Sequence, residues 1–193
     1  MNNIKSNEIL SRAHFLDNES PEHSYHKSYF HFINYFAERN EITEQDLVIG
    51  SNFTYGWMPT ILNFKSADFQ LAVDALNRAK ATARISSTDL MVLKGLINNS
   101  LVGVSKLLHF INPQVYAIWD SRVCNFLTGK SHKQKVENIE RFWSYLDLCE
   151  RVTRARGFEQ IHASFADHIG YAVSPMRIPE QIMFHSSHDP IRG

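Results

Sequence analysis

The sequence predicts an all-α protein of roughly eight helices. Helix-capping signals recur along the chain, and apolar residues repeat at helical spacing between them. No window shows the sustained apolar and polar alternation that is typical of strands. With 193 residues, of which 44% are hydrophobic, the chain is long enough to bury a substantial core.

Residues 1–65 contain two predicted helices and one irregular aromatic segment. Serine, proline and glutamate at 20–22 predict a helix start, and apolar spacing carries that helix to about residue 39. Thr43 caps a second, short helix that Gly50 is expected to end. The following segment, 52–59, interrupts the periodicity and contains Tyr55 and Trp57.

The remaining helices are expected to begin at Ser66, near Leu90, after Ser100, after Asp120, near Val136 and near Phe158. Beyond Gly170, prolines at 175, 179 and 190 predict an arm packed along the surface. The chain is expected to be one compact domain, 1–193. The alternative is two lobes, with 1–65 and the arm 170–193 in one and 66–169 in the other.

Composition limits the class of protein. Cys124 and Cys149 both lie in predicted helices, which predicts buried thiols, and no segment approaches the roughly 20 apolar residues of a membrane span. We therefore expect a cytoplasmic protein that does not contact a membrane and binds no cofactor. His23, His26 and His31 fan around one predicted helix, so no metal site is expected there.

The most informative stretch runs from Lys94 to Leu127. Asn98 and Asn99 tolerate left-handed backbone, Ser100 can cap the next helix, and Gly103 permits close approach of another segment. The start of that helix is a ready anion site, and Lys106 lies about one turn into it.

Within this stretch, Leu101-Val102-Gly103-Val104-Ser105 resembles the L-P-G-V-G hairpin of the helix-hairpin-helix DNA glycosylases, and Asp120 stands where those enzymes have their single aspartate. The group that it resembles most is the bacterial one similar to 8-oxoguanine glycosylase. The resemblance implies an all-helical enzyme that flips a modified base out of DNA. In such enzymes the hairpin amides hold a phosphate, and the aspartate drives cleavage of the base–sugar bond.

The match has three differences. Val102 replaces the family proline, Ser105 replaces the second glycine, and the interval from the hairpin to the aspartate is about four residues shorter. The lysine that forms a Schiff base in bifunctional members aligns with Leu107, one residue beyond Lys106. A monofunctional enzyme is therefore expected. Repair of oxidised or alkylated bases and phage defence by excision of glucosylated hydroxymethylcytosine both remain open.

The resemblance and the residue types together give three sets of site residues. The catalytic pair is Asp120, as acid–base group or cation stabiliser, and Lys106. The expected base pocket, where aromatic faces stack on a base, contains Tyr55, Trp57, His109 and Trp119. For Tyr55 and Trp57 the alternative is that they fill the domain interface. The expected DNA contacts are Lys94, Ser100, Gly103, Val104, Ser105, Ser121, Arg122, Lys130, Lys133 and Lys135.

Charge supports a polyanionic partner. Between Arg78 and Lys135 there are nine basic residues and only two acidic ones, Asp89 and Asp120. A monomer that binds DNA in a salt-sensitive manner is therefore expected. The alternative is a non-catalytic helical DNA-binding module in which Asp120 only caps its helix. A metal-dependent nuclease would need a second carboxylate beside Asp120. The position of Asp120 separates the first two: a place on a cleft floor favours the enzyme, and a side chain folded onto its own helix amides favours the module.

Overall fold

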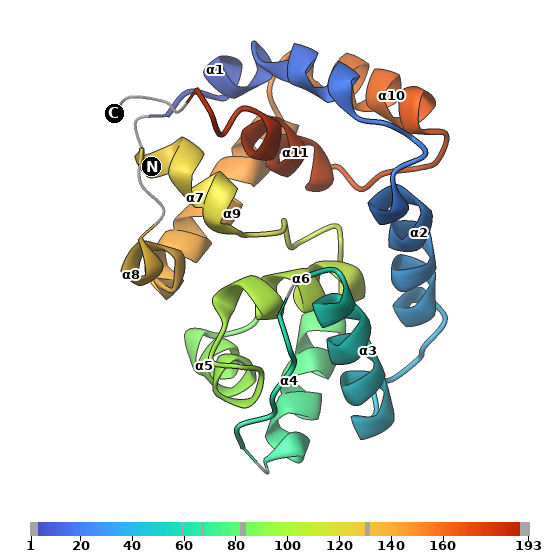
Figure 1. Ribbon diagram of the computed structural model, residues 1–193, viewed down its shortest axis with the longest axis vertical. Coiled ribbons are helices and arrows are strands. Elements are labelled where there is room, and N and C mark those ends of the chain that lie inside the picture. The colour runs from blue at the N-terminus through green and yellow to red at the C-terminus, as the bar shows by residue number, and fades with distance from the viewer. Residues whose placement is uncertain (1–3, 59, 67, 82–83, 130–131, 190–193) are drawn as a thin grey trace.

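Eleven α-helices and one 3-10 helix form the part of the chain that the computed structural model describes, residues 4–58, 60–66, 68–81, 84–129 and 132–189 (Figure 1). The predicted all-α class is confirmed, with more helices than the roughly eight expected. Among these residues the only paired extended backbone is an isolated bridge between Phe64 and Ile97. The elements are α1 (Ser6–Leu10), η1 (Ala13–Asn18), α2 (Ser24–Ala37), α3 (Glu44–Gly56), α4 (Phe69–Ala81), α5 (Ser87–Leu96), α6 (Leu101–Ile111), α7 (Ser121–Thr128), α8 (Lys133–Val136), α9 (Ile139–Thr153), α10 (Phe158–Ile169) and α11 (Arg177–His185).

The two ends of the chain pack together. Helix α1 contacts α9 and α11, and η1 contacts α10 and α11, so the first helices lie with the last ones at one end of the molecule (Figure 1). At the other end α3, α4 and α5 surround α6. Residues 6–18 therefore pack with the C-terminal helices.

Helix α6 is central because its sequence is apolar around most of its circumference. It contacts α2, α3, α4 and α5. Its buried side chains include Leu101, Val104, Leu107, Leu108 and Phe110. The residues of the predicted hairpin are therefore largely part of the core.

Helix α2 begins later than the sequence predicts. Its N-cap is His23, whose backbone is extended and whose Nδ1 accepts a hydrogen bond from the Tyr25 amide at 3.3 Å. Ser20 and Pro21 precede the helix and do not start it. Ser20 and Pro21 predict a helix start at residue 20, but the His23 side chain caps the helix three residues later.

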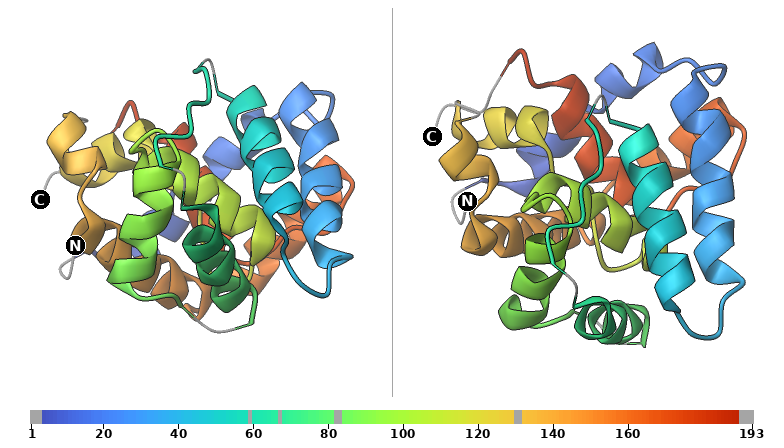
Figure 2. Two further views of the ribbon diagram at one scale, coloured as in Figure 1. Left: turned by 90° about the horizontal axis from the view of Figure 1, so that it is seen from below. Right: turned by 60° about the horizontal axis from the view of Figure 1, so that its bottom comes forward.

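Helix α3 runs through the segment that was expected to be irregular. Gly50 does not end it, because this glycine is needed for packing: an added Cβ would lie 2.4 Å from Cζ of Phe36. Helices α2 and α3 lie side by side there (Figure 2), and the rings of Phe32 and Phe53 stack with centroids 4.2 Å apart. Tyr55 and the C-cap residue Trp57 are thereby fixed at the end of a helix.

Replacing Gly50 by alanine is expected to destabilise the fold by roughly 1–3 kcal/mol, the usual cost of overpacking a core. Gly95, at an exposed position of α5, offers the matched control, since no atom lies within 4 Å of its added Cβ. Gly95→Ala is expected to stabilise by about 0.5–1 kcal/mol through helix propensity. Urea denaturation of both variants checks this, and a shift in the same direction for both would contradict the packing argument.

The predicted C-terminal arm is wrong. Residues 177–185 form helix α11, most of which is buried. Pro179 is accommodated because it lies in the first turn, where a backbone N–H has no acceptor within the helix. Ile178 and Ile182, one turn apart, are fully buried and hold the helix against the core.

Candidate functional site

A cavity of about 230 Å³ brings the two predicted catalytic residues together. Asp120 comes from the N-terminus of α7 and Lys106 from the middle of α6. Helices α2 and α11 supply further lining residues, as do the end of α3 and the segments that contain Glu19 and Ile118. The lining residues are Glu19, Tyr25, His26, Trp57, Met58, Lys106, Ile118, Asp120, Arg122, Arg177, Glu180, Gln181 and Phe184.

Ser105 fixes the position of Asp120 relative to Lys106. Its buried hydroxyl accepts a hydrogen bond from the Trp119 amide at 3.0 Å and lies 2.9 Å from the Val102 carbonyl oxygen and 3.0 Å from that of Trp119. The extended segment before Asp120 is thus held against α6. Ser105 was expected to contact a phosphate; that expectation is corrected, because the hydroxyl is used inside the core.

Asp120 both caps a helix and faces the cavity. Its Oδ1 accepts a hydrogen bond from the Val123 amide at 2.9 Å. Its Oδ2 has no hydrogen-bond partner in the described part of the chain. One oxygen therefore orients the carboxylate, and the other is available to a ligand.

Lys106 lies deep in the cavity wall. Burial lowers the pKa of its ammonium group, although the charges of Asp120 and Glu180 act to raise it. In the residues described, Lys106 makes no ion pair with either carboxylate within 4.0 Å. The amine therefore loses its proton more readily than an exposed lysine does, and no partner holds it.

The part of the cavity wall formed by α11 contains a buried ion pair that the sequence does not reveal. Arg177 Nη1 lies 2.5 Å from Glu180 Oε2, and Gln181 Nε2 donates to both Glu180 oxygens at 3.3 and 3.1 Å. Burial raises the pKa of the Glu180 carboxyl, against the opposing charge of Arg177. The spacing of Ile178 and Ile182 is the signal in the sequence that indicates a helix here. The prolines at 175 and 179 obscure that signal.

The Glu19 carboxylate links helices α2 and α11 beside the cavity. Its carboxylate lies 2.7 Å from His26 Nε2 on α2 and 2.5 Å from His185 Nε2 on α11. The close contacts with His185 and His26 hold the pKa of Glu19 well below its usual range. The same His26 contacts the Tyr171 hydroxyl at 2.8 Å. This network closes the cavity between the first and last segments of the chain.

Aromatic side chains also line the cavity. Trp57 is one of them, and its indole N–H donates to Ser28 Oγ at 2.8 Å. The ring of Tyr25 contacts Trp57 edge-on, with centroids 5.4 Å apart. The Arg122 guanidinium of α7 lies 4.5 Å from the centroid of the Phe184 ring of α11.

Three other residues expected in a base pocket do not line this cavity. Tyr55 packs under Gly103, whose added Cβ would lie 2.6 Å from the Tyr55 hydroxyl oxygen. His109 is fully buried, accepts from the Tyr29 hydroxyl at 2.8 Å and donates to the Tyr116 carbonyl at 2.5 Å; burial lowers its pKa to about 3. Trp119 donates to the Val136 carbonyl at 2.7 Å. The expectation is corrected because all three are core residues.

The hairpin has the predicted backbone but a different occupant. Asn98 and Asn99 have φ of 54° and 52°, and Ser100 Oγ accepts from the Gly103 amide at 3.2 Å, as predicted. However, the Leu101 amide donates to Glu137 Oε2 at 2.9 Å, and Lys94 Nζ lies 3.1 Å from the same oxygen. A carboxylate of the protein thus occupies the expected phosphate position.

The expected DNA contacts are scattered and several are engaged elsewhere. Lys94 pairs with Glu137, and Gly103, Val104 and Ser105 are buried. In the same basic region, Arg84 pairs with Asp147 and Glu150. Exposed or half-buried positions are Ser100, Ser121, Arg122, Lys133 and Lys135, and Lys130 lies outside the described residues.

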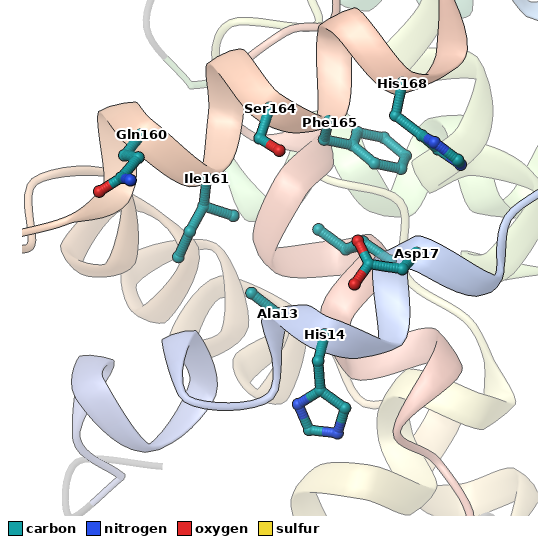
Figure 3. Close-up of a pocket in the computed structure, with 9 residues that line it drawn as sticks. Ala13, His14, Asp17, Gln160, Ile161, Ser164, Phe165 and His168 are labelled. Carbon is teal, nitrogen blue, oxygen red and sulfur yellow. The ribbon is translucent and has the colours of Figure 1, made fainter.

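A second cavity, of about 240 Å³, lies between η1 and α10 (Figure 3). Asp17 faces α10 across it, whereas His14 points away from that helix. Its polar residues, including Asp17, Ser164 and His168, are exposed. It lacks the buried charges of the Asp120 cavity, so the latter is the stronger candidate site.

Comparison with known proteins adds no assignment: a scan of protein-family models and searches of curated proteins and solved structures find no match to this chain. Within the described part of the chain, no helix is long and apolar enough to cross a membrane, and no three metal-ligating side chains converge on one point. Cys124 and Cys149 are buried thiols that form no disulfide, as predicted.

Proposed function

We propose that this protein is a DNA N-glycosylase that excises a modified base from a flipped nucleotide in the Asp120 cavity. The observation that carries the proposal is that Asp120 and Lys106 line one cavity together with aromatic side chains. Family resemblance selects the chemistry, and the cavity supplies a place in which that chemistry can occur.

Cleavage of the bond between a base and its sugar develops positive charge on the sugar ring. The free Oδ2 of Asp120 is suited to stabilise that charge, or to activate an attacking water. Because the Val123 amide already holds Oδ1, the carboxylate needs little reorganisation during the reaction. Lys106 is suited to attack the same sugar carbon as an uncharged amine, since a desolvated lysine is an activated nucleophile.

The cavity fits a single base better than a larger ligand. Its volume of about 230 Å³ lies below the roughly 300–1,000 Å³ that is typical of pockets for drug-sized molecules. Trp57, Tyr25 and Phe184 are among the residues that line it, and base stacking on such rings contributes roughly 1–3 kcal/mol. Extrusion of one nucleotide would bring the base–sugar bond between these rings and Asp120.

The catalytic proposal is favoured over a binding module because the hairpin phosphate position is filled by Glu137. A metal nuclease finds its second carboxylate in Glu180, but Arg177 and Gln181 engage that carboxylate. Neither alternative uses the placement of Asp120 and Lys106 in one cavity.

The proposal is tested by incubating the protein with duplexes that contain 8-oxoguanine, 7-methylguanine, glucosylated 5-hydroxymethylcytosine or only unmodified bases. We expect free base and abasic sites from at least one of the modified duplexes and none from the unmodified one. Mass spectrometry detects the base, and alkaline cleavage detects the abasic site. Binding of these duplexes without any base release would favour the module.

The position of Glu137 leads to a separate prediction about DNA affinity. Glu137→Gln is expected to tighten DNA binding several-fold, since it removes a negative charge and frees Lys94 and the Leu101 amide for a phosphate. The dependence of log affinity on log salt should steepen by about 0.9, corresponding to one further phosphate contact. Fluorescence anisotropy over a salt series measures both quantities. Glu159→Gln, at an exposed position of α10, is the matched control, and equal behaviour of the two variants would remove the hairpin from the DNA interface.

A further inference from the structure

Arg177 is the one buried guanidinium in the cavity wall, and the mechanism above gives it no task. Its side chain is nearly inaccessible to solvent, with 9% of the residue exposed. Nη1 is paired with Glu180 at 2.5 Å, and the guanidinium carbon lies 5.2 Å from the centroid of the Tyr29 ring. Nε and Nη2 have no acceptor in the part of the chain that the structure describes. Donors of a buried cation are therefore left for whatever occupies the cavity.

Arg177 and Asp120 line the cavity from two different helices, α11 and α7. The Arg177 guanidinium lies beside Glu180 and near the Tyr29 ring of α2. Asp120 begins α7, and its Oδ1 is held by the Val123 amide. A base whose sugar lies beside Asp120 therefore shares a cavity of about 230 Å³ with the unused Arg177 donors.

The proposed reaction develops charge on both the base and the sugar. When the bond between C1′ and the base nitrogen breaks, its electron pair stays with the base, so negative charge develops there while positive charge develops on the sugar. A water oxygen or the Lys106 nitrogen forms the new bond to C1′ and loses a proton, and the departed base takes up a proton from solvent. Arginine remains protonated throughout, so it can donate hydrogen bonds to the leaving base but not supply that proton.

We propose that Arg177 is a further catalytic residue, which donates hydrogen bonds to a carbonyl oxygen of the departing base. This assignment rests on the proposed N-glycosylase function and narrows its substrate class. The substrate is a neutral base whose carbonyl oxygen shares the developing charge, such as a cytosine derivative or an oxidised purine. N-alkylated purines are disfavoured, because they already carry positive charge and leave as neutral molecules.

The burial of Arg177 is what makes such a contact effective. Preorganised donors in a site that excludes water stabilise developing charge far more than solvent-exposed donors do. Glu180 compensates the charge of the free protein, so the arginine can remain buried before a base arrives.

The test compares Arg177→Gln, Arg177→Lys and, as control, Arg151→Gln at an exposed position of α9 in single-turnover base release. The duplexes contain 8-oxoguanine, 7-methylguanine, glucosylated 5-hydroxymethylcytosine, or the deaminated analogue of whichever base the unaltered protein releases. We expect release of a neutral carbonyl base and none of 7-methylguanine. Arg177→Gln should lose roughly 10²-fold, the scale of one lost charge-stabilising donor, and the deaminated base, a better leaving group, should recover much of that loss.

A purely structural role predicts a different pattern. It would slow the deaminated and the ordinary base equally, and that result would overturn the assignment, as would faster release of 7-methylguanine. If Arg177→Gln fails to fold, Arg177→Lys carries the same comparison, since it keeps the charge but loses the planar pair of donors. Failure of the unaltered protein to release any base would overturn the proposed function itself, whereas release with an Arg177-independent rate would overturn only this inference.

Discussion

Lys106→Gln is expected to abolish a covalent adduct between the protein and its substrate DNA that borohydride traps in the unaltered protein. The amine lies in the same cavity as Asp120, and burial lowers its pKa. Attack on C1′ displaces the base, and ring opening of the sugar gives a Schiff base, which borohydride reduces to a stable amine. Base release should fall about 10²-fold in the variant. Trapping in the unaltered protein should rise with pH until the amine is fully neutral.

Denaturing gel electrophoresis after reduction measures the adduct directly. Lys65→Gln, an exposed lysine outside the cavity, is the matched control and should trap as the unaltered protein does. The sequence alone predicts no adduct, because the family lysine aligns with Leu107. Base release without any trapped adduct would show that water, and not Lys106, attacks C1′. Lys106 would then have only an electrostatic role.

The parts of the fold that follow from local chemistry were predictable from the sequence. Thr43, Ser100 and Asp120 accept hydrogen bonds from the first turns of their helices, as expected of capping residues. Gly129 and Gly170 end helices with positive φ. These features depend on a few neighbouring residues, so a single sequence reveals them.

The errors arose where a distant contact decides the local structure. Gly50 alone predicts the end of a helix. In the fold, Phe36 on another helix requires a residue without a side chain there. The prolines after Gly170 were read as breakers, but burial of Ile178 and Ile182 stabilises a helix that starts just before Pro179. Neither contact is visible from spacing within the segment itself.

The site was predictable in part for the same reason. Asp120, Lys106 and Trp57 were identified from short motifs, and the cavity includes all three. Arg177, Glu180 and Glu19 were missed because they reach it from opposite ends of the chain. The excess of positive charge between residues 78 and 135 is also smaller in the folded protein than in the sequence. Glu137 lies just beyond that segment and neutralises Lys94.

The central claim is that the Asp120 carboxylate stabilises the sugar cation while it also caps α7. Asp120→Asn separates the two roles, because asparagine caps a helix about as well as aspartate but carries no charge. We expect the melting temperature to change little, and DNA binding to persist or tighten as negative charge leaves the cavity.

Single-turnover base release by Asp120→Asn, at protein concentrations that saturate the DNA, is the most direct measurement. The account predicts a rate lower by roughly 10²-fold or more, the scale of losing a positioned acid–base group. Asp167→Asn, at an exposed position of α10, should release base at the unaltered rate. Release at the unaltered rate by Asp120→Asn would contradict the account and leave Asp120 as a helix cap alone.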